Sequence, residues 1–424
     1  MIEQARAWLA AHQLGPGDRL GLALTDRPET VALIQAAWVS GVVLVPFNRR
    51  LDAQTLKEQA ERAHLRAVVA DAGHPLPGST GFSLPAWATE SDRGRLKPAL
   101  PADDAEALVL FTSGTTGPAK AARIPRRAVQ HAVTASCARL GLGPDDTWLG
   151  CLPLDHIAGI GNALRALHSG CRLVQHPRFD TDAILHALDH ERITGLSVVP
   201  TQLHRLVAAG RPWPATLRTI LVGGAPLEPP LRAACIALGV APRQTYGLSE
   251  CCAMVTCQEA GADDDGCGTA LPGVELRVVE GRIAVCGPTV FLGYDDGIGG
   301  PDADGWFTTG DHGALDAAGR LTVLGRREDL ILSGGENVYP AQVEARLRAL
   351  PGVAEALVVG LPDAEWGQIV AAVLVGTPGP IDFISLPGPW RPRAWRWVDE
   401  LPRTPLGKPD RRAVLADAAT FIRA

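Results

Sequence analysis

The chain has 424 residues and a mass of 44.7 kDa, about three times the length of a typical domain of roughly 150 residues, which excludes a peptide or a mini-scaffold. Hydrophobic residues make up 46% of the chain and charged residues 20%, a composition that excludes a disordered protein. The formal net charge of -6 gives no global basic field that would favour nucleic acid or anionic lipid. We therefore expect a globular protein of two or three domains that binds no nucleic acid.

The cysteines and the N-terminus indicate a reducing compartment. The chain has nine cysteines, an odd number, and no Cys-x-x-Cys pair, which argues against both a disulfide framework and a zinc ribbon. Residues 1–13 lack the basic segment and the apolar core of a signal peptide. No apolar run approaches the ~18 residues needed to cross a bilayer. We expect a cytoplasmic protein with no membrane span.

The first half of the chain alternates helical patterns with short apolar strands, which predicts βαβ units on a parallel sheet. Helices are predicted over residues 2–12, 29–39, 53–63, 126–140, 162–168 and 181–192. Strands are predicted over residues 20–24, 42–46, 67–70, 108–112, 148–152, 172–175, 195–199 and 219–222. This alternation of helices and strands predicts one large layered domain.

The texture changes between residues 272 and 324 to short strands separated by Gly and Asp turns, predicted over residues 274–279, 282–286 and 321–324. Such a pattern indicates an antiparallel sheet or a small barrel. From residue 329 onward a compact α+β segment follows. The predicted fold class is therefore α/β, with layered α/β sheets plus a small β-barrel in residues 1–328 and a small α+β C-terminal domain in residues 329–424.

The segment richest in chemical information is an apolar strand that runs into Thr112-Ser113-Gly114-Thr115-Thr116-Gly117 and then Lys120. Small residues let backbone N–H groups close around phosphate oxygens, hydroxyls add donors, and the lysine adds a positive charge. The alternative for any glycine-rich segment is a polar turn between a strand and a helix. Six consecutive small residues favour phosphate binding. The spacing is not that of a Walker A loop, and Gly159 with Gly161 lacks the third glycine of a dinucleotide fingerprint.

This loop resembles the signature Thr-Ser-Gly-Thr-Thr-Gly-x-Pro-Lys-Gly of the adenylate-forming superfamily, which comprises acyl-CoA synthetases, adenylation domains and luciferases. Five further motifs match in the superfamily's order and extend the resemblance over nearly the whole chain. They are Gly223-Gly224-Ala225-Pro226, Tyr246-Gly247-Leu248-Ser249-Glu250, Thr309-Gly310-Asp311, the segment from Gly325-Arg326 through Asp329 to Ser333-Gly334-Gly335-Glu336, and Pro402-Arg403-Thr404-Pro405-Leu406-Gly407-Lys408.

The resemblance implies an AMP-forming acid–thiol ligase that uses ATP, Mg²⁺ and coenzyme A and acts through an acyl-adenylate. Phosphates would be bound by the loop from Thr112 to Gly117 and by Lys120. The resemblance assigns the adenine pocket, with Tyr246 stacked on the base, and the ribose and phosphate contacts to the matching residues Gly224, Ala225, Pro226, Tyr246, Gly247, Ser249, Asp311 and Arg326. Glu250 would hold Mg²⁺, with Thr116 as a second candidate ligand.

Activation of a carboxylate brings one anion onto another, so cations and donors must surround the reacting atoms. The resemblance implies that Lys408 bridges the attacking carboxylate and the α-phosphate, and that His156 lines the acid pocket. Asp329 would be the hinge of a mobile C-terminal domain. Its rotation would withdraw Lys408 and present Gly334, Gly335 and Glu336 for attack by the CoA thiol. Outside such motifs, lone charged residues are mostly solvated, and a His between apolar residues is mostly a hydrogen-bonded core residue.

Within the superfamily the chain most resembles the o-succinylbenzoate–CoA ligase group of menaquinone biosynthesis, through residues 46–51, 152–159, 221–227 and 244–251. An acid with a second carboxylate needs a cation in its pocket. Arg165 is a candidate, and a plain surface helix is the alternative. Three other functions stay open: a fatty-acid or aryl-acid CoA ligase, a stand-alone adenylation enzyme that loads a carrier-protein thiol, and a nucleotide sensor without turnover. A homodimer is also left open.

Two positions depart from the superfamily pattern. The phosphate loop ends Gly117-Pro118-Ala119-Lys120-Ala121, so the lysine is kept while the residues on either side of it differ. Asp155 stands beside His156 where an aromatic residue is common. These departures leave the handling of pyrophosphate and the surroundings of His156 as questions for the structure.

Overall fold

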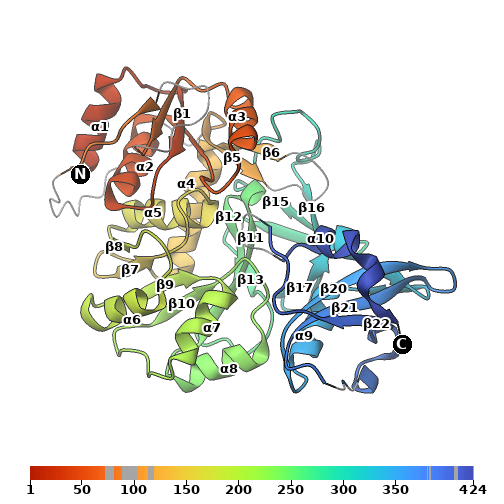
Figure 1. Ribbon diagram of the computed structural model, residues 1–424. Coiled ribbons are helices and arrows are strands. Elements are labelled where there is room, and N and C mark those ends of the chain that lie inside the picture. The colour runs from red at the N-terminus through yellow and green to blue at the C-terminus, as the bar shows by residue number, and fades with distance from the viewer. Residues whose placement is uncertain are drawn as a thin grey trace. The chain divides into compact units, whose positions relative to one another are not determined.

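The computed structural model describes residues 1–71, 81–87, 103–112, 119–379, 381, 383–404 and 409–423. The chain divides into two compact units, which are described separately (Figure 1). Unit 1 comprises Met1–Arg277, Ala284–Thr308 and Leu315–Thr322, and unit 2 comprises Val278–Ile283, Thr309–Ala314 and Val323–Ala424. The domain boundary expected after residue 328 stays a prediction.

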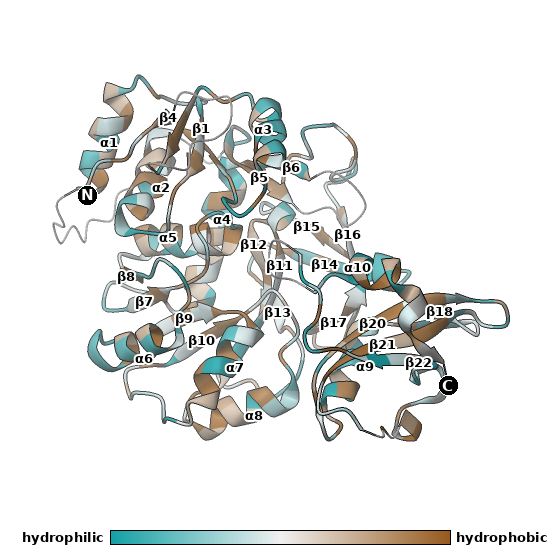
Figure 2. Cartoon of the chain, viewed as in Figure 1, coloured by the Kyte–Doolittle hydropathy of each residue, from teal (hydrophilic) through white to brown (hydrophobic). Residues whose placement is uncertain are grey.

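Unit 1 contains a six-stranded sheet in the order β4-β3-β1-β2-β5-β6. Its strands are β1 (Arg19–Ala23), β2 (Val43–Pro46), β3 (Ala67–Ala70), β4 (Gly81–Phe82), β5 (Glu106–Thr112) and β6 (Lys120–Pro125). Strand β1 pairs in parallel with β2 and β3, whereas β5 and β6 are antiparallel. The helices are α1 (Ile2–Ala11), α2 (Pro28–Ser40) and α3 (Ala53–Arg62). Helix α2 is buried over most of its length, while α3 buries only Gln59 and is largely hydrophilic in Figure 2.

A seven-stranded sheet in unit 1 has the order β13-β12-β11-β10-β9-β7-β8. Its strands are β7 (Thr147–Gly150), β8 (Arg172–Gln175), β9 (Gly195–Val198), β10 (Thr219–Val222), β11 (Pro242–Leu248), β12 (Ala253–Cys257) and β13 (Thr269–Ala270). The helices are α4 (Arg126–Leu140), α5 (Ile157–Ser169), α6 (Thr181–His190), α7 (Pro200–Ala208) and α8 (Pro229–Ala237). Strands β7 to β11 are parallel, whereas β12 and β13 are antiparallel.

Helices α4 and α5 link the two sheets. Helix α4 contacts β5 and β6 of the first sheet and β12 of the second, and α5 contacts α2 as well as β7 and β8. Under the second sheet a core of aliphatic side chains, among them Leu149, Ile184 and Ile220, is almost fully buried. The structure thus confirms the predicted α/β fold class of layered sheets and helices.

Helix α5 begins at residue 157, five residues before the predicted start. The prediction began too late because Gly159 and Gly161 interrupt the helical pattern of the sequence. Gly159 lies so close to the preceding turn that an added Cβ would sit 2.1 Å from the Pro153 carbonyl oxygen. Gly159 is therefore required for close packing against the preceding turn, and it does not interrupt the helix. The early start makes His156 the N-cap residue.

The region predicted as a small barrel is a four-stranded sheet in the order β14-β15-β16-β17. Its strands are β14 (Glu275–Val279), β15 (Arg282–Cys286), β16 (Phe307–Leu315) and β17 (Leu321–Arg326). Within the described residues this order does not close on itself, because β14 and β17 are the ends of the sheet. An open sheet therefore replaces the barrel of the sequence prediction.

Unit 2 also contains a sheet in the order β19-β18-β21-β22-β23, with β20 paired to β21. Its elements are β18 (Ile331–Ser333), β19 (Glu336–Val338), α9 (Pro340–Arg348), β20 (Val353–Asp363), β21 (Gly367–Gly376), β22 (Ala394–Trp397), α10 (Arg411–Ala416) and β23 (Ile422–Arg423). Alternate residues of β21 enter two cores, Val370 and Ala372 one core and Ile369 and Ala371 the other. Both faces are buried, so β21 is a continuous apolar run, brown in Figure 2.

Short 3₁₀ helices lie between these elements, namely Ser249–Cys251, Arg327–Asp329, Phe383–Ser385, Gly388–Trp390 and Ala418–Thr420. No helix within the described ranges is both long and apolar enough to cross a membrane.

Candidate functional site

Three of the predicted motifs emerge at one edge of the seven-stranded sheet. Residues 151–156 follow β7, residues 223–226 follow β10, and residues 246–250 close β11 and lead into a 3₁₀ turn. These strands are parallel, with Ile220 opposite Pro242 in neighbouring β10 and β11. The carboxyl ends of parallel strands form the crevice in which open α/β sheets bind ligands. The fold therefore brings the acid-side and adenine-side motifs together.

The segment Gly223–Pro226 turns sharply at the end of β10. Gly224 has a φ of +79°, a conformation that residues with a Cβ rarely adopt, and Gly224, Ala225 and Pro226 are exposed. A Cβ at Gly223 would lie 3.0 Å from the Cγ2 methyl of Thr245 on β11. The exposed backbone at this turn is available to a flat ligand.

Tyr246 and Gly247 sit at an irregularity in the pairing of β11 with β12. Tyr246 is buried, whereas Gly247 is exposed and so close to β12 that an added Cβ would lie 1.5 Å from the Ala253 carbonyl oxygen. Ser249 and Glu250 follow in the 3₁₀ turn and are half-buried. The glycine allows the chain to leave the sheet and turn Glu250 toward the strand edge.

We predict that Gly247→Ala strains this turn. The added methyl group overlaps the Ala253 carbonyl, so we expect the free energy of unfolding to fall by about 1–3 kcal/mol and ATP binding to weaken. Urea unfolding and ATP titration measure the two effects. Gly143→Ala is the matched control, because a Cβ there has open space around it. Equal stability of the two variants would contradict the packing argument.

The Glu250 carboxylate is held by Tyr294. The Tyr294 hydroxyl donates to Glu250 Oε1 at 2.7 Å, and the Phe291 N–H donates to the Glu250 carbonyl at 2.9 Å. Burial and the adjacent Glu250 charge raise the pKa of the Tyr294 phenol, so the hydroxyl remains a donor. Glu250 Oε2 has no hydrogen-bond partner among the described residues. A free carboxylate oxygen is a ligand that Mg²⁺ accepts.

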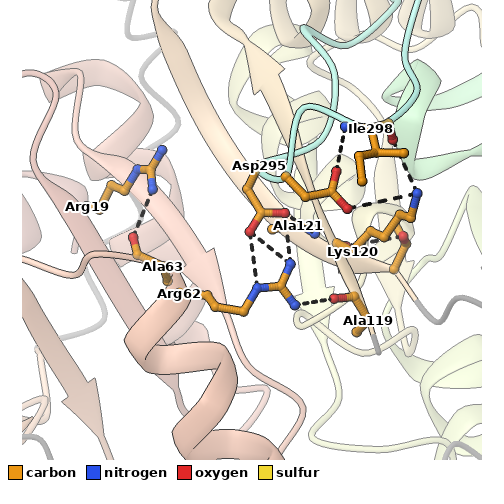
Figure 3. A network of polar contacts seen from close by, with 10 residues as sticks. Arg19, Arg62, Ala63, Ala119, Lys120, Ala121, Asp295 and Ile298 are labelled. Atoms are coloured by element: carbon orange, nitrogen blue, oxygen red, sulfur yellow. Dashed lines mark hydrogen bonds and ion pairs between the residues drawn. The ribbon is translucent and has the colours of Figure 1, made fainter. Parts of the chain in front are cut away.

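Lys120 begins β6 and lies against the same tyrosine. Its Nζ is 4.9 Å from the centre of the Tyr294 ring and donates to the Ile298 carbonyl at 3.2 Å. Asp296 Oδ2 is 4.0 Å from the ammonium. Figure 3 shows the extended lysine beside the loop that carries Ile298. Lys120 and Glu250, which lie far apart in sequence, thus meet at Tyr294.

The backbone on both sides of Lys120 is fixed by an ion pair (Figure 3). Arg62, the last residue of α3, donates to both carboxylate oxygens of Asp295 at 2.9 Å and to the Ala119 carbonyl at 2.7 Å. Asp295 also accepts the Ala121 N–H at 3.1 Å. Ala119 and Ala121 are the two positions that depart from the superfamily signature. The Arg62–Asp295 ion pair therefore holds the backbone at both altered positions.

Thr112 is the last residue of β5, and its hydroxyl donates to the Lys120 carbonyl at 3.3 Å. The other predicted loop residues, namely Ser113, Gly114, Thr115, Thr116 and Gly117, lie outside the described residues, as does Lys408. Their predicted roles stay predictions.

His156 stands beside the carboxyl group of Asp155. Its side chain is 51% exposed, and Nε2 lies 3.8 Å from Asp155 Oδ1. Burial raises the pKa of Asp155, against the opposing effect of His156. Burial also raises the pKa of Asp26 to about 6, although its Oδ1 accepts the Leu154 N–H at 3.0 Å. His156 is therefore accessible from solvent, unlike the core histidine of the alternative interpretation.

The raised pKa of Asp26 predicts a pH-dependent stability. The native state holds this proton up to pH about 6, whereas an Asp in the unfolded chain releases it near pH 3.8, its ordinary pKa. Stability therefore falls as pH rises from about 4 to 6, by roughly 2–3 kcal/mol. We expect Asp26→Asn to lose less stability than the wild type between pH 4 and pH 7 in urea unfolding. Parallel pH profiles of the two proteins would exclude Asp26 as the cause.

A small pocket, partly open to solvent, lies between α4, α5 and the strand that follows Glu250. Its lining includes Val129, Ile157, Gly161, Arg165, Ala253 and Met254. Apart from Arg165, these side chains are apolar or absent. The pocket runs along one face of α5, because Ile157, Gly161 and Arg165 are one helical turn apart.

Arg165 is buried in this pocket, with 5% of its surface exposed, so the alternative of a plain surface helix is wrong. Its guanidinium donates to Asn162 Oδ1 and lies 3.8 Å from Met254 Sδ, while Nε has no partner. Burial lowers the pKa of Arg165, against opposing effects of nearby cysteines. Among the described residues, no carboxylate lies within ion-pair distance of this cation.

In unit 2, the predicted ribose residue Asp311 lies on β16 and is nearly buried. Arg326, at the end of β17, donates through Nε to Asp311 Oδ1 at 2.8 Å. The predicted hinge residue Asp329 follows in a 3₁₀ turn, and its Oδ2 lies 3.6 Å from Arg411 Nη1. Arg411 Nη2 also pairs with the buried Glu344 at 2.5 Å. The Asp329 carboxylate is therefore tied to α10 directly and to α9 through Arg411.

Gly334 and Gly335 form the turn between β18 and β19 and are exposed together with Glu336. Both glycines have positive φ, +58° and +85°. A Cβ at Gly334 would lie 2.7 Å from the Trp366 ring, so this turn requires glycine for close packing as well as for its conformation. The turn presents bare backbone at the surface of unit 2.

Two family models match the chain. Residues 1–295 match the model described as AMP-binding enzyme, and residues 342–408 match the AMP-binding enzyme C-terminal domain.

Relatives and solved structures agree with these matches. The chain is 33% identical to 2-succinylbenzoate–CoA ligase from Bacillus licheniformis over 94% of this chain and 90% of the relative. It is 35% identical to the enzyme of the same name from Bacillus velezensis, over 86% and 79%. The structure of o-succinylbenzoate CoA synthetase from Bacillus subtilis with the acyl-adenylate OSB-AMP superposes with a TM-score of 0.87 at 29% identity, covering 100% of this chain and 92% of that one. A complex of that enzyme with ATP and magnesium gives 0.86 at 30% identity, over 97% and 92%.

Proposed function

We propose a function from the premise that this chain belongs to the AMP-binding enzyme family: it is a 2-succinylbenzoate–CoA ligase that forms AMP and pyrophosphate. ATP, Mg²⁺ and CoA are its co-substrates and cofactor, as the resemblance implies. The pathway is menaquinone biosynthesis. The premise rests on a family match over most of the chain and on relatives of at least 30% identity that the chain covers almost completely.

The reaction has two steps. One carboxylate of the acid attacks the α-phosphorus of ATP, the bond to pyrophosphate breaks, and an acyl-adenylate forms. The CoA sulfur then attacks the acyl carbonyl, its proton passes to solvent, and AMP leaves with the electron pair of the acyl–oxygen bond. Mg²⁺ supplies charge neutralisation at the triphosphate when it is bound.

This chain's own groups fit that chemistry. Glu250 Oε2, which has no partner in the described part of the chain, would hold Mg²⁺, and Lys120 is the cation that ends the phosphate loop. Asp311, with two acceptor oxygens, would receive the ribose hydroxyls and keep Arg326 in place. Lys408 would bring the attacking carboxylate onto the α-phosphate, and the hinge at Asp329 would remove it afterwards.

The burial of Arg165 in the pocket is the observation that supports 2-succinylbenzoate as the acid. 2-Succinylbenzoate has two carboxylates, of which only one becomes the adenylate. The other enters the acid pocket as an anion and needs a buried partner. Arg165 is such a partner, because it is a buried cation in a mostly apolar pocket without a carboxylate of the described chain beside it. A fatty acid or a simple aryl acid would leave this cation unpaired.

We expect Arg165→Met to raise KM for 2-succinylbenzoate about 10²-fold or more, because truncation leaves the second carboxylate buried without a partner. KM for a monocarboxylic analogue of the same length should change little. Acid-dependent pyrophosphate release measures both. Arg232→Met is the control, because Arg232 is also 5% exposed but hydrogen-bonds to Gln258 away from the pocket. An unchanged acid preference in Arg165→Met would remove Arg165 from the proposal.

The proposal also covers the thiol that accepts the acyl group and the cell compartment of the protein. Free CoA, rather than a carrier-protein thiol, is the acceptor that the relatives' name indicates. The cytoplasm is the proposed location, because all nine cysteines are free thiols. The homodimer stays a prediction, which light scattering of the purified chain decides.

A further inference from the structure

Tyr294 occupies an unusual position between two groups of opposite charge. Its hydroxyl contacts Glu250 Oε1 at 2.7 Å, and its ring face lies 4.9 Å from Lys120 Nζ. Glu250 and Lys120 form no ion pair with each other in the described structure. They contact different parts of one side chain, which holds them apart.

The backbone around Tyr294 is itself fixed. Residues 292–295 run beside β6, with Ala122 bridged to Tyr294, the Leu292 N–H bonded to the Arg123 carbonyl at 2.9 Å and the Arg123 N–H bonded to the Gly293 carbonyl at 3.1 Å. The next residue, Asp295, is clamped by Arg62 (Figure 3). The Phe291 ring packs edge-on against the Tyr294 ring at 4.9 Å. Tyr294 is thus anchored before any ligand arrives.

We propose that Tyr294 is a positioning residue that fixes Glu250 so that Oε2 faces the metal of bound Mg²⁺–ATP and keeps Lys120 from neutralising this carboxylate. The inference rests on the proposed function, because it assigns Mg²⁺–ATP to this site. A carboxylate with one oxygen held by a donor loses rotational freedom, and outer partners of this kind tune metal affinity by 10–100-fold. The ring, in turn, attracts the lysine ammonium through its negative face.

Two variants separate the contact of the hydroxyl from that of the ring. Tyr294→Phe deletes the hydroxyl and keeps the ring, whereas Tyr294→Leu deletes both. We expect Tyr294→Phe to weaken binding of Mn²⁺ to the enzyme–ATP complex about tenfold, measured from the EPR signal of free Mn²⁺. Turnover should fall at low Mg²⁺, and raising the Mg²⁺ concentration should restore part of it. Tyr294→Leu should show the same loss of metal affinity and also a higher KM for ATP.

A double-mutant cycle separates positioning from a structural role. If the hydroxyl acts through Glu250, Tyr294→Phe added to Glu250→Gln lowers Mn²⁺ affinity no further. Tyr339→Phe is the control, because it deletes a hydroxyl that is bonded to His312 in unit 2 and should leave Mn²⁺ affinity unchanged. Additive losses in the double variant, or unchanged Mn²⁺ affinity in Tyr294→Phe, would overturn the proposal. Mn²⁺–ATP binding needs no acid, so a wrong acid assignment would leave this result intact and appear only in pyrophosphate release.

Discussion

Replacement of Glu250 by Gln is expected to slow acid-dependent pyrophosphate release about 10²–10³-fold. The amide keeps the shape of the side chain and can still accept the Tyr294 hydroxyl, but it offers no negative charge to Mg²⁺. Raising Mg²⁺ should restore part of the rate. Pyrophosphate release over a Mg²⁺ titration measures both effects.

Glu259→Gln is the matched control for this prediction. It removes the same charge nine residues further along, from a side chain that is 69% exposed and paired with Arg139. We expect the control to keep wild-type activity. Equal activity of both variants would show that Glu250 is not the metal ligand.

Replacement of Lys408 by Ala is expected to slow only the first step, by about 10²–10³-fold, because the ammonium would stabilise charge during attack on the α-phosphate. Thioester formation from supplied acyl-adenylate and CoA should keep its wild-type rate. Two rapid-quench assays, one for each step, measure this split.

Lys57→Ala is the control for Lys408, because Lys57 is an exposed lysine on α3 that pairs weakly with Glu61. It should change neither step. A loss of both steps in Lys408→Ala would contradict a role confined to adenylation and would indicate damage to the C-terminal domain instead.

The layered sheets could be predicted because buried parallel strands are short apolar runs. Residues 67–70, 172–175 and 219–222 were predicted as strands with the bounds that the structure gives to β3, β8 and β10, and residues 126–140 as helix α4. In β3, β10 and α4 hydrophobic burial decides the local structure, and a single sequence reports such burial directly, whereas no residue of β8 is fully buried.

Strand β11 escaped prediction because its buried residues include the strongly polar Arg243 and Gln244. Arg243 and Gln244 are each 5% exposed. Arg243 donates through Nε to the Gln258 carbonyl, and the backbone N–H of Gln244 donates to Gln258 Oε1. Polar groups can be buried when they are hydrogen-bonded, yet the partner lies in a different segment and leaves no local periodicity. The hydrophobic pattern therefore fails at the strand that carries the Tyr246–Glu250 motif.

The site was predicted through motifs, and the groups that position it were not. Tyr294 and the Arg62–Asp295 pair have no motif of their own in the sequence, and Arg62 and Asp295 are 233 residues apart. Their importance follows only from the pairing of residues 292–295 with β6. Arg165 was visible as a charge, but only the early start of α5 and the packing of α4 against it show that the charge is buried.

The most direct measurement is product analysis with the purified chain, ATP, Mg²⁺, CoA and 2-succinylbenzoate. We predict one pyrophosphate and one AMP for each 2-succinylbenzoyl-CoA, and accumulation of enzyme-bound acyl-adenylate when CoA is omitted. Preference for this diacid over monocarboxylic analogues should disappear in Arg165→Met. No release of pyrophosphate that depends on 2-succinylbenzoate would contradict the proposed function.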